Sequence, residues 1–268
     1  MKKIPIIIFV FSFSKIYAQE LFVFTEPASN MAARSIGIRM NNYLMKEKAT
    51  NRHNYHLLPE LMMGISRKIM LHGEMFLSNR NDKFVAEGGS IYLKYRLLSI
   101  DDVHSHFRLA VLARYSYNNS DVHQQAIDFF GHNAGYEGGL VATKLAHKVA
   151  VSAGASIMHA TDNGKEKFAY SNKERDALYY TLSVGKLMLP KEYTNYNQTN
   201  LNLMLELIGQ ANLGSNRTYL DLAPSIQFIF GSRARLDLGY RFALADELQR
   251  TSPNGFAAKV EYNFFNVL

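Results

Sequence analysis

The chain has 268 residues, no cysteine and a formal net charge of +7. The absence of cysteine excludes a small secreted fold that is stapled by disulfides. Basic residues are spread along the chain, with no basic run beyond the first few residues, so we expect no nucleic-acid partner despite the charge.

The N-terminus has the layout of a secretory signal peptide. Met1-Lys2-Lys3 is cationic, residues 4–13 are largely apolar, and the small residue Ala18 precedes Gln19. We therefore predict that residues 1–18 are a signal peptide. The alternative is an N-terminal membrane anchor, but the apolar run is shorter than the roughly 20 residues that a spanning helix needs. Since no cysteine follows, a lipid-anchored lipoprotein is excluded.

Residues 19–33 do not alternate between apolar and polar side chains. We assign them to a periplasmic N-terminal segment, which forms either a tail or a small plug inside the domain that follows. The sequence leaves both placements open. No later stretch has the length of a transmembrane helix, so the exported chain is periplasmic, secreted or located in the outer membrane.

From residue 34 the chain repeats a segment of about ten residues in which apolar and polar side chains alternate. Leu236 and Leu238, for example, alternate with Asp237 and Gly239. Successive strand residues point to opposite faces, so each segment has one apolar face and one polar or small face. The predicted strands are 34–43, 55–66, 69–79, 88–97, 105–118, 133–145, 148–159, 175–187, 199–211, 218–230, 234–245 and 255–265.

A soluble β-sandwich also alternates, but three features favour a membrane barrel. The strands have about the 9–11 residues of tilted membrane strands. The polar face mixes charges with small residues, as in Ala150, Ser152 and Gly154. Finally, tight turns alternate with longer polar loops, as outer-membrane barrels require. The turns are Arg67-Lys68, Ala146-His147 and Gly231-Ser232, and the loops are 44–54, 80–87, 119–132, 160–174, 213–217 and 246–254.

We therefore predict an all-β fold, a transmembrane antiparallel up-and-down β-barrel of about 12 strands over residues 34–268, in contact with outer-membrane lipid. An even number of strands leaves both barrel termini in the periplasm and the longer loops outside the cell. Tyrosines near strand ends would form aromatic girdles at the headgroup level. They are Tyr43, Tyr55, Tyr115, Tyr117, Tyr136, Tyr219 and Tyr262.

The ending Val260-Glu261-Tyr262-Asn263-Phe264-Phe265 resembles the aromatic C-terminal strand that outer-membrane proteins present to the barrel-insertion machinery, although three residues follow it. The chain also resembles small Gram-negative, Bacteroidetes-type barrels grouped with the meta-pathway phenol-degradation transporter family. That resemblance lies in residues 61–68 and 93–97. It implies a transporter-like role in the outer membrane and carries over no binding residues.

The charged side chains of the polar faces are the candidate site, because a charge turned to lipid at the midplane costs about 2–4 kcal/mol. They could line a selective pore or form a salt-bridged plug. Arg96, Arg108 and Arg114 lie on neighbouring strands and favour anionic solutes in the pore interpretation. The predicted lining is Arg39, Glu60, His72, Glu74, Lys94, Arg96, Arg108, Arg114, Glu206, Asp221, Arg235, Asp237, Arg241, Lys259 and Glu261.

Two weaker patterns concern metals and catalysis. Histidines and carboxylates gather in two connections but with no diagnostic metal spacing, so we expect no metal and no cofactor. They are His104, His106, Asp101 and Asp102, then His123 and His132. Lipid hydrolysis would need a serine activated by a histidine. The candidate pairs, Ser156 with His159 and Ser66 with His72, come with no nucleophile motif.

The sequence-based hypothesis is passive passage of a small, unidentified solute across the outer membrane. A non-conducting structural or surface-interaction barrel is the second hypothesis, and a lipid-modifying enzyme is the third.

Overall fold

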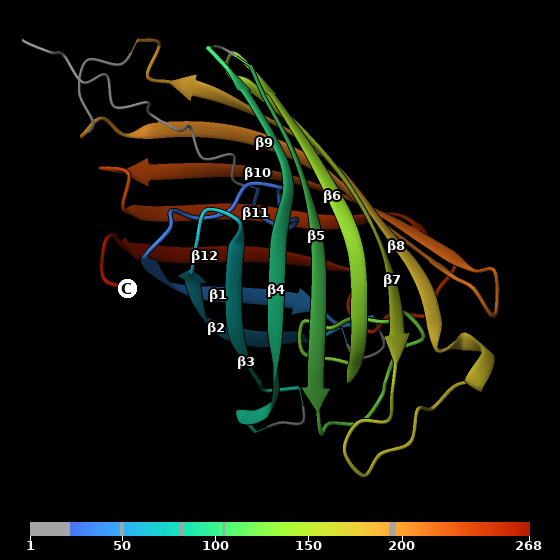
Figure 1. Ribbon diagram of the computed structural model, residues 1–268. Helices are drawn as coiled ribbons and strands as arrows, with labels where there is room; N and C mark the ends of the chain where they lie inside the picture. Colours follow the sequence, from blue (N-terminus) through green and yellow to red (C-terminus); the bar gives the residue numbers. More distant parts are fainter. Residues whose placement is uncertain (1–21, 49–50, 81–82, 104, 193–196) are drawn as a thin grey trace, which may run out of the picture.

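The computed structural model describes residues 22–48, 51–80, 83–103, 105–192 and 197–268. The predicted signal peptide and residues 19–21 lie outside this range. The strands form one closed antiparallel barrel (Figure 1). Their bounds are β1 Ser35–Lys46, β2 His53–Gly64, β3 Ile69–Ser78, β4 Val85–Asp102, β5 Ser105–Asn118, β6 Gly135–Ala146, β7 Val149–Ala160, β8 Asp176–Leu189, β9 Asn200–Asn212, β10 Thr218–Phe230, β11 Ala234–Asp246 and β12 Asn254–Phe264.

Each strand pairs with its sequence neighbours, and β1 closes the ring on β12. In that closing pair Ile36 lies opposite Phe264 and Lys46 lies opposite Asn254. Closure pairs every strand on both sides, which removes the open edges that would otherwise need cover. The predicted fold class, an antiparallel barrel of about twelve strands, is confirmed.

The largest departure from the predicted strands is β4, which is 18 residues long where the sequence predicted 88–97. The register of β4 against β5 shifts between Arg96 and Leu98. A bulge of this kind breaks the period-two pattern. Leu97 and Leu98 are therefore both exposed, and the polar end of β4 continues to pair beyond the point where the alternation stops.

The outer face of the barrel is apolar and the inner face is polar. Exposed large hydrophobic residues occur on all twelve strands, for example Leu44 on β1, Ile91 on β4 and Leu203 on β9. The buried residues include Lys94, Glu206 and Asp237, each with 0% exposure. This arrangement is the inverse of a soluble fold and suits a barrel surrounded by hydrocarbon.

The start of β1 and the C-terminus lie at one end of the barrel, called here the terminal end. The Val267 amide donates to the Arg34 carbonyl, which joins the C-terminus to the start of β1. The tight turns lie at this end; Gly231 and Ser232 have φ values of 53° and 58°, as a two-residue hairpin turn of the primed type requires. The connections that begin after β1, β3, β5, β7, β9 and β11 lie at the opposite end, called here the loop end. One long connection departs from the predicted alternation, because β8 ends and β9 begins at the terminal end with residues 190–199 between them.

Not every tyrosine of the predicted girdles faces outward. Tyr115, Tyr117 and Tyr136 are exposed, and the rings of the first and last are in tilted contact with their centroids 5.3 Å apart. Tyr219 is only 4% exposed. Its ring lies under the Arg250 guanidinium at 4.0 Å, so its assignment to a girdle is wrong.

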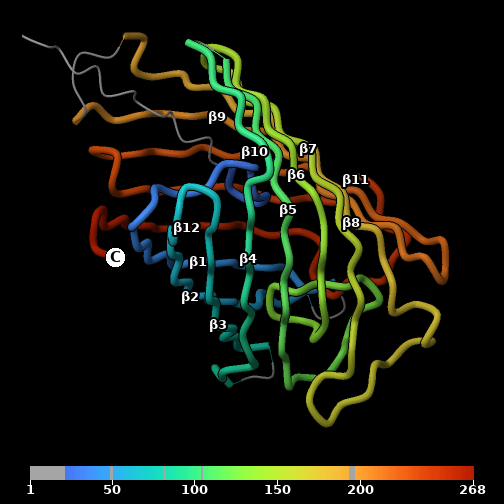
Figure 2. The backbone as a smooth tube through the Cα atoms, viewed as in Figure 1, coloured from blue at the N-terminus to red at the C-terminus, as the bar shows by residue number. Residues whose placement is uncertain are grey.

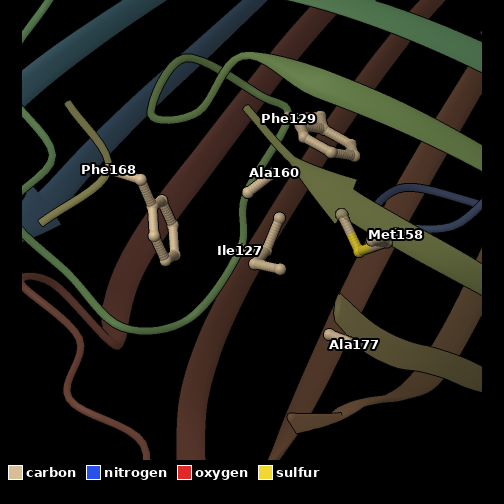
Figure 3. Packing of buried hydrophobic residues seen from close by; sticks show 6 residues of the cluster. All are labelled: Ile127, Phe129, Met158, Ala160, Phe168 and Ala177. Atoms are coloured by element: carbon tan, nitrogen blue, oxygen red, sulfur yellow. The ribbon is translucent and has the colours of Figure 1, made fainter. Parts of the chain in front are cut away.

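Two non-strand segments fill the interior. The N-terminal segment, residues 22–34, runs within the ring of strands as the blue trace of Figure 2. The β5–β6 loop, residues 119–134, folds into the loop end, where Phe129 is fully buried. Figure 3 shows Ile127 and Phe129 of this loop against Met158, Ala160 and Ala177 of the wall. No helix within the described ranges is long and apolar enough to cross a membrane.

Candidate functional site

The charges predicted from the sequence all follow the inner-face alternation of their strands. Most are buried, while Arg39, Arg96 and Arg241 are partly exposed. What the sequence could not reveal is their partners. The structure divides them into two groups, those that pair with one another across the wall and those that bind the N-terminal segment.

Arg39 is the centre of the first group. Its guanidinium lies 2.8 Å from Glu261, 3.1 Å from Glu60 and 3.8 Å from Glu26 of the N-terminal segment. Glu60 is also 2.6 Å from the His72 ring. Four strands and the N-terminal segment therefore share one buried ion network at the terminal half of the barrel.

The same pattern continues on both sides of Arg39. Arg235 lies 2.9 Å from Asp237 and 3.0 Å from Glu261. Arg114 lies 3.2 Å from Glu137 and 3.9 Å from Glu74.

The expected anion-selective arginine row is therefore compensated. Arg114 has these two carboxylates, and Arg108 lies 3.4 Å from Asp101 and donates to the Ser29 hydroxyl at 2.7 Å. The lumen carries both signs of charge in close pairs, so Arg108 and Arg114 do not give it a net positive lining.

The N-terminal segment is bound first through its amides. Glu206 accepts hydrogen bonds from the backbone N–H groups of Val23, Phe24 and Thr25 at 2.8–3.2 Å. It also accepts one from the Thr25 hydroxyl at 2.8 Å. Further along, the Ala28 amide donates to the Thr143 hydroxyl at 2.8 Å. One buried carboxylate thus fixes three consecutive residues of the segment.

Two wall lysines bind the carbonyl side of the same segment. Lys94 donates to the Pro27 carbonyl at 2.7 Å and lies 3.2 Å from the Glu26 carboxylate. Lys259 donates to the Val23 carbonyl. Because the segment supplies carbonyls and a carboxylate where the wall supplies ammonium groups, these buried cations are satisfied.

The aromatic side chains of the segment occupy gaps in the wall. Phe22 packs with Leu145, Ala150 and Met204. The Phe24 ring lies so close to Gly239 that a Cβ on that glycine would be 2.7 Å from it. A larger residue at this inner-face position would therefore displace the ring, which explains why a glycine fits there.

The β5–β6 loop is held by polar contacts at the loop end. The Gln210 side chain both accepts from the Ile127 amide at 2.9 Å and donates to its carbonyl at 2.8 Å. Asn163 donates to the carbonyls of Ser120 and His132 at 2.9 and 2.7 Å. The loop is thus fixed by side chains of β9 and of the β7–β8 connection.

His132 forms a third attachment of this loop. Its Nδ1 accepts from the Arg80 guanidinium at 2.7 Å, and its ring centroid lies 5.4 Å from that of His56. Burial, and then the charge of Arg80, hold the pKa of His132 well below its usual range. The ring is therefore neutral at neutral pH.

The two segments meet near the middle of the barrel. Ala126 of the loop belongs to an apolar cluster with Ile208, Tyr219 and Ala223, and Phe24 of the N-terminal segment packs against it. Beside the N-terminal segment a cavity of about 20 Å³ remains, which is room for roughly one water molecule. The lumen is therefore occupied from both ends.

The catalytic pairs considered from the sequence do not form. Ser156 points inward and donates to Glu137 at 2.7 Å, whereas His159 is exposed and pairs with Asp176 at 2.8 Å. His72 is bound to Glu60 rather than to Ser66.

Among the residues described, no group of three or more His, Asp or Glu side chains could hold a metal ion. His104, one of the histidines considered from the sequence, lies outside the described residues.

Comparison with family models and with curated proteins finds no match. Solved structures do match in fold. The COG4313 outer membrane channel from Pseudomonas putida F1 is 13% identical, with a TM-score of 0.55 over 91% of this chain and 100% of that one. The fold is that of a porin-like outer-membrane barrel. The KdgM porin matches it at 10% identity, with a TM-score of 0.50 over 85% of this chain and 99% of that one.

Proposed function

We propose that this porin-like barrel is an outer-membrane channel for the passive passage of a small solute. The observation that carries the proposal is the content of the lumen. Side chains of opposite walls do not fill the barrel alone; the wall encloses enough space for a peptide segment and a loop. A polar wall around a lumen that is wide enough to hold a polypeptide segment is the kind of wall that a channel has.

The occupants are held by contacts that can be exchanged for water. The N-terminal segment is bound through hydrogen bonds and ion pairs to Glu206, Lys94 and Lys259, which hydrated solutes could replace. In this proposal residues 22–34 and the β5–β6 loop set the conductance, and their displacement widens the passage.

The second candidate, a non-conducting structural or surface-interaction barrel, is favoured by the same filled lumen. If the segment and the loop never leave, the buried ion pairs serve only to specify the fold. The third candidate, a lipid-modifying enzyme, has less support because Ser156 and His159 lie on opposite faces of β7.

The location in the cell is part of the proposal. The apolar outer belt supports insertion in the outer membrane, with the terminal end in the periplasm and the loop end outside. Residues 1–18 would direct export, and the aromatic strand β12 would be presented to the insertion machinery. The resemblance to the meta-pathway family stays a prediction.

Liposome swelling tests the function directly. Purified protein in vesicles should admit small solutes and cause swelling in an isotonic solute bath, at a rate that falls with solute size. Vesicles of the same lipid without protein provide the baseline. If correctly folded, inserted protein leaves the rate at that baseline for every small solute, the non-conducting barrel is the better description.

A further inference from the structure

We propose that the wall around residues 22–28 is a binding site for an extended acidic peptide, and that the N-terminal segment occupies this site within its own chain. The substrate class of the channel is then short acidic peptides. Passage of such peptides rests on the channel function proposed above, whereas binding at this site can be measured without it.

The wall recognises features that every peptide has. Glu206 binds the amides of Val23, Phe24 and Thr25, and Lys94 and Lys259 bind carbonyls of the same stretch. These contacts do not depend on the side chains of the segment. An extended chain of another sequence would find the same donors and acceptors, as in other peptide sites that read the main chain.

Side-chain contacts define which peptides fit. The Glu26 carboxylate lies 3.2 Å from Lys94 and 3.8 Å from Arg39. Two residues earlier, the Phe24 ring lies against Gly239, with the Lys259 ammonium 5.9 Å from its centroid. The site therefore selects an aromatic residue followed two positions later by an acidic one.

Two buried charges of the wall bind the segment rather than other wall charges. Glu206 and Lys94 are both 0% exposed. Within the described ranges, all the hydrogen bonds of Glu206 go to residues 23–25, and those of Lys94 go to Glu26 and Pro27. When the segment leaves, the Glu206 carboxylate and the Lys94 ammonium lose their hydrogen-bond partners. A second peptide is a ligand that would supply partners to both groups.

The test uses a full-length release variant, Phe24→Pro with Glu26→Lys. Proline at residue 24 removes an N–H donor to Glu206, and lysine at residue 26 places a cation against Lys94 and Arg39. These changes weaken the binding of the segment and leave every wall residue unchanged. The probe is a fluorescent synthetic peptide with the sequence of residues 22–33. Fluorescence anisotropy in detergent reports binding, and heat-dependent gel migration confirms that the barrel is folded.

We expect saturable binding to the release variant and at least tenfold weaker binding to the wild-type chain, whose own segment competes. A probe with lysine in place of the residue-26 glutamate should bind the release variant roughly ten- to hundredfold more weakly, because it loses a charge-assisted contact. Glu166→Lys, which makes the same charge change in an exposed loop, should bind like the wild type.

Equal binding of the two probes, or no saturable binding to a folded release variant, would overturn the peptide site. If the Phe24→Pro, Glu26→Lys chain does not fold, Thr25→Ala, which removes the hydroxyl bonds to Glu206 and Ser183, serves the same comparison with a smaller expected gain. Liposome swelling separates the two proposals: a barrel that binds the probe but admits no solute keeps the peptide site and loses the channel.

Discussion

At the scale of single residues, the direction of each side chain follows from alternation, while its partner does not. The period-two pattern places Arg39, Asp237 and Glu261 on one face. It does not reveal that Arg235 joins Asp237 to Glu261, because the contact with Glu261 depends on the register between β11 and β12. Charge position could therefore be predicted from the sequence, and charge pairing could not.

The assignment of faces predicts opposite outcomes for two substitutions on β11. Leu238→Arg turns a charge to lipid and should cost about 2–4 kcal/mol near the midplane, so folding to the heat-modifiable form should fall sharply. Arg241→Leu should leave the barrel assembled. Its partner Asp221 accepts from Arg241 at 2.6 Å but also from Arg250 at 2.6 Å, so the carboxylate keeps a cation.

Heat-dependent gel migration of the two variants measures this difference. Normal folding of Leu238→Arg together with failure of Arg241→Leu would mean that the faces are inverted.

At the scale of elements, the strands were predictable and the placement of the N-terminal segment was not. All twelve predicted strands correspond to observed ones, because each must present about ten alternating residues to lipid. The segment 22–34 has no such constraint. The sequence left open a tail or a plug, and only the contacts of Glu206 and Lys94 place the segment inside. A run such as Phe24-Thr25-Glu26 has no apolar–polar period from which its position in the fold could be predicted.

The β5–β6 loop should respond to acid. His132 accepts a hydrogen bond from Arg80 only when its Nδ1 is unprotonated, and the ring also faces His56, Asp128 and, more remotely, His123. Since its pKa is lower in the folded loop than in the released one, the packed loop has its full stability above about pH 6.5 and loses stability as the pH falls below that value.

Hydrogen–deuterium exchange at about pH 7.5 and about pH 5, corrected for intrinsic rates, checks this. Protection over residues 119–134 should fall at the lower pH in the wild-type chain and change less in His132→Gln. Equal protection of the wild-type loop at both values would show that His132 does not control the packing of the loop.

At the scale of the whole molecule, the structure places the connections that follow the odd-numbered strands at one end, but the orientation in the membrane stays a prediction. Ser120 is buried, so a tag there would disturb the β5–β6 loop. Lys165, in the exposed β7–β8 connection, is a better site. A tag at Lys165 should be labelled on intact cells, and one between Ala146 and His147 only after the outer membrane is opened. The reverse labelling would invert the proposed topology.

Because the barrel is closed and its lumen is filled, the proposed channel function predicts how the conductance depends on the N-terminal segment. If the barrel is a channel with a removable occupant, its conductance should be small while residues 22–34 are bound in the lumen. The conductance should rise when the binding of that segment is weakened. A non-conducting barrel should be silent in both states, since its interior would be packed whatever the N-terminal segment does.

Single-channel recording in planar bilayers tests this claim most directly. The wild-type chain should give small or infrequent discrete steps, and the Phe24→Pro, Glu26→Lys chain should give larger or longer ones, with Glu166→Lys behaving like the wild type. If the wild-type chain and the double variant both insert as folded barrels and neither gives conductance steps, the protein is not a channel.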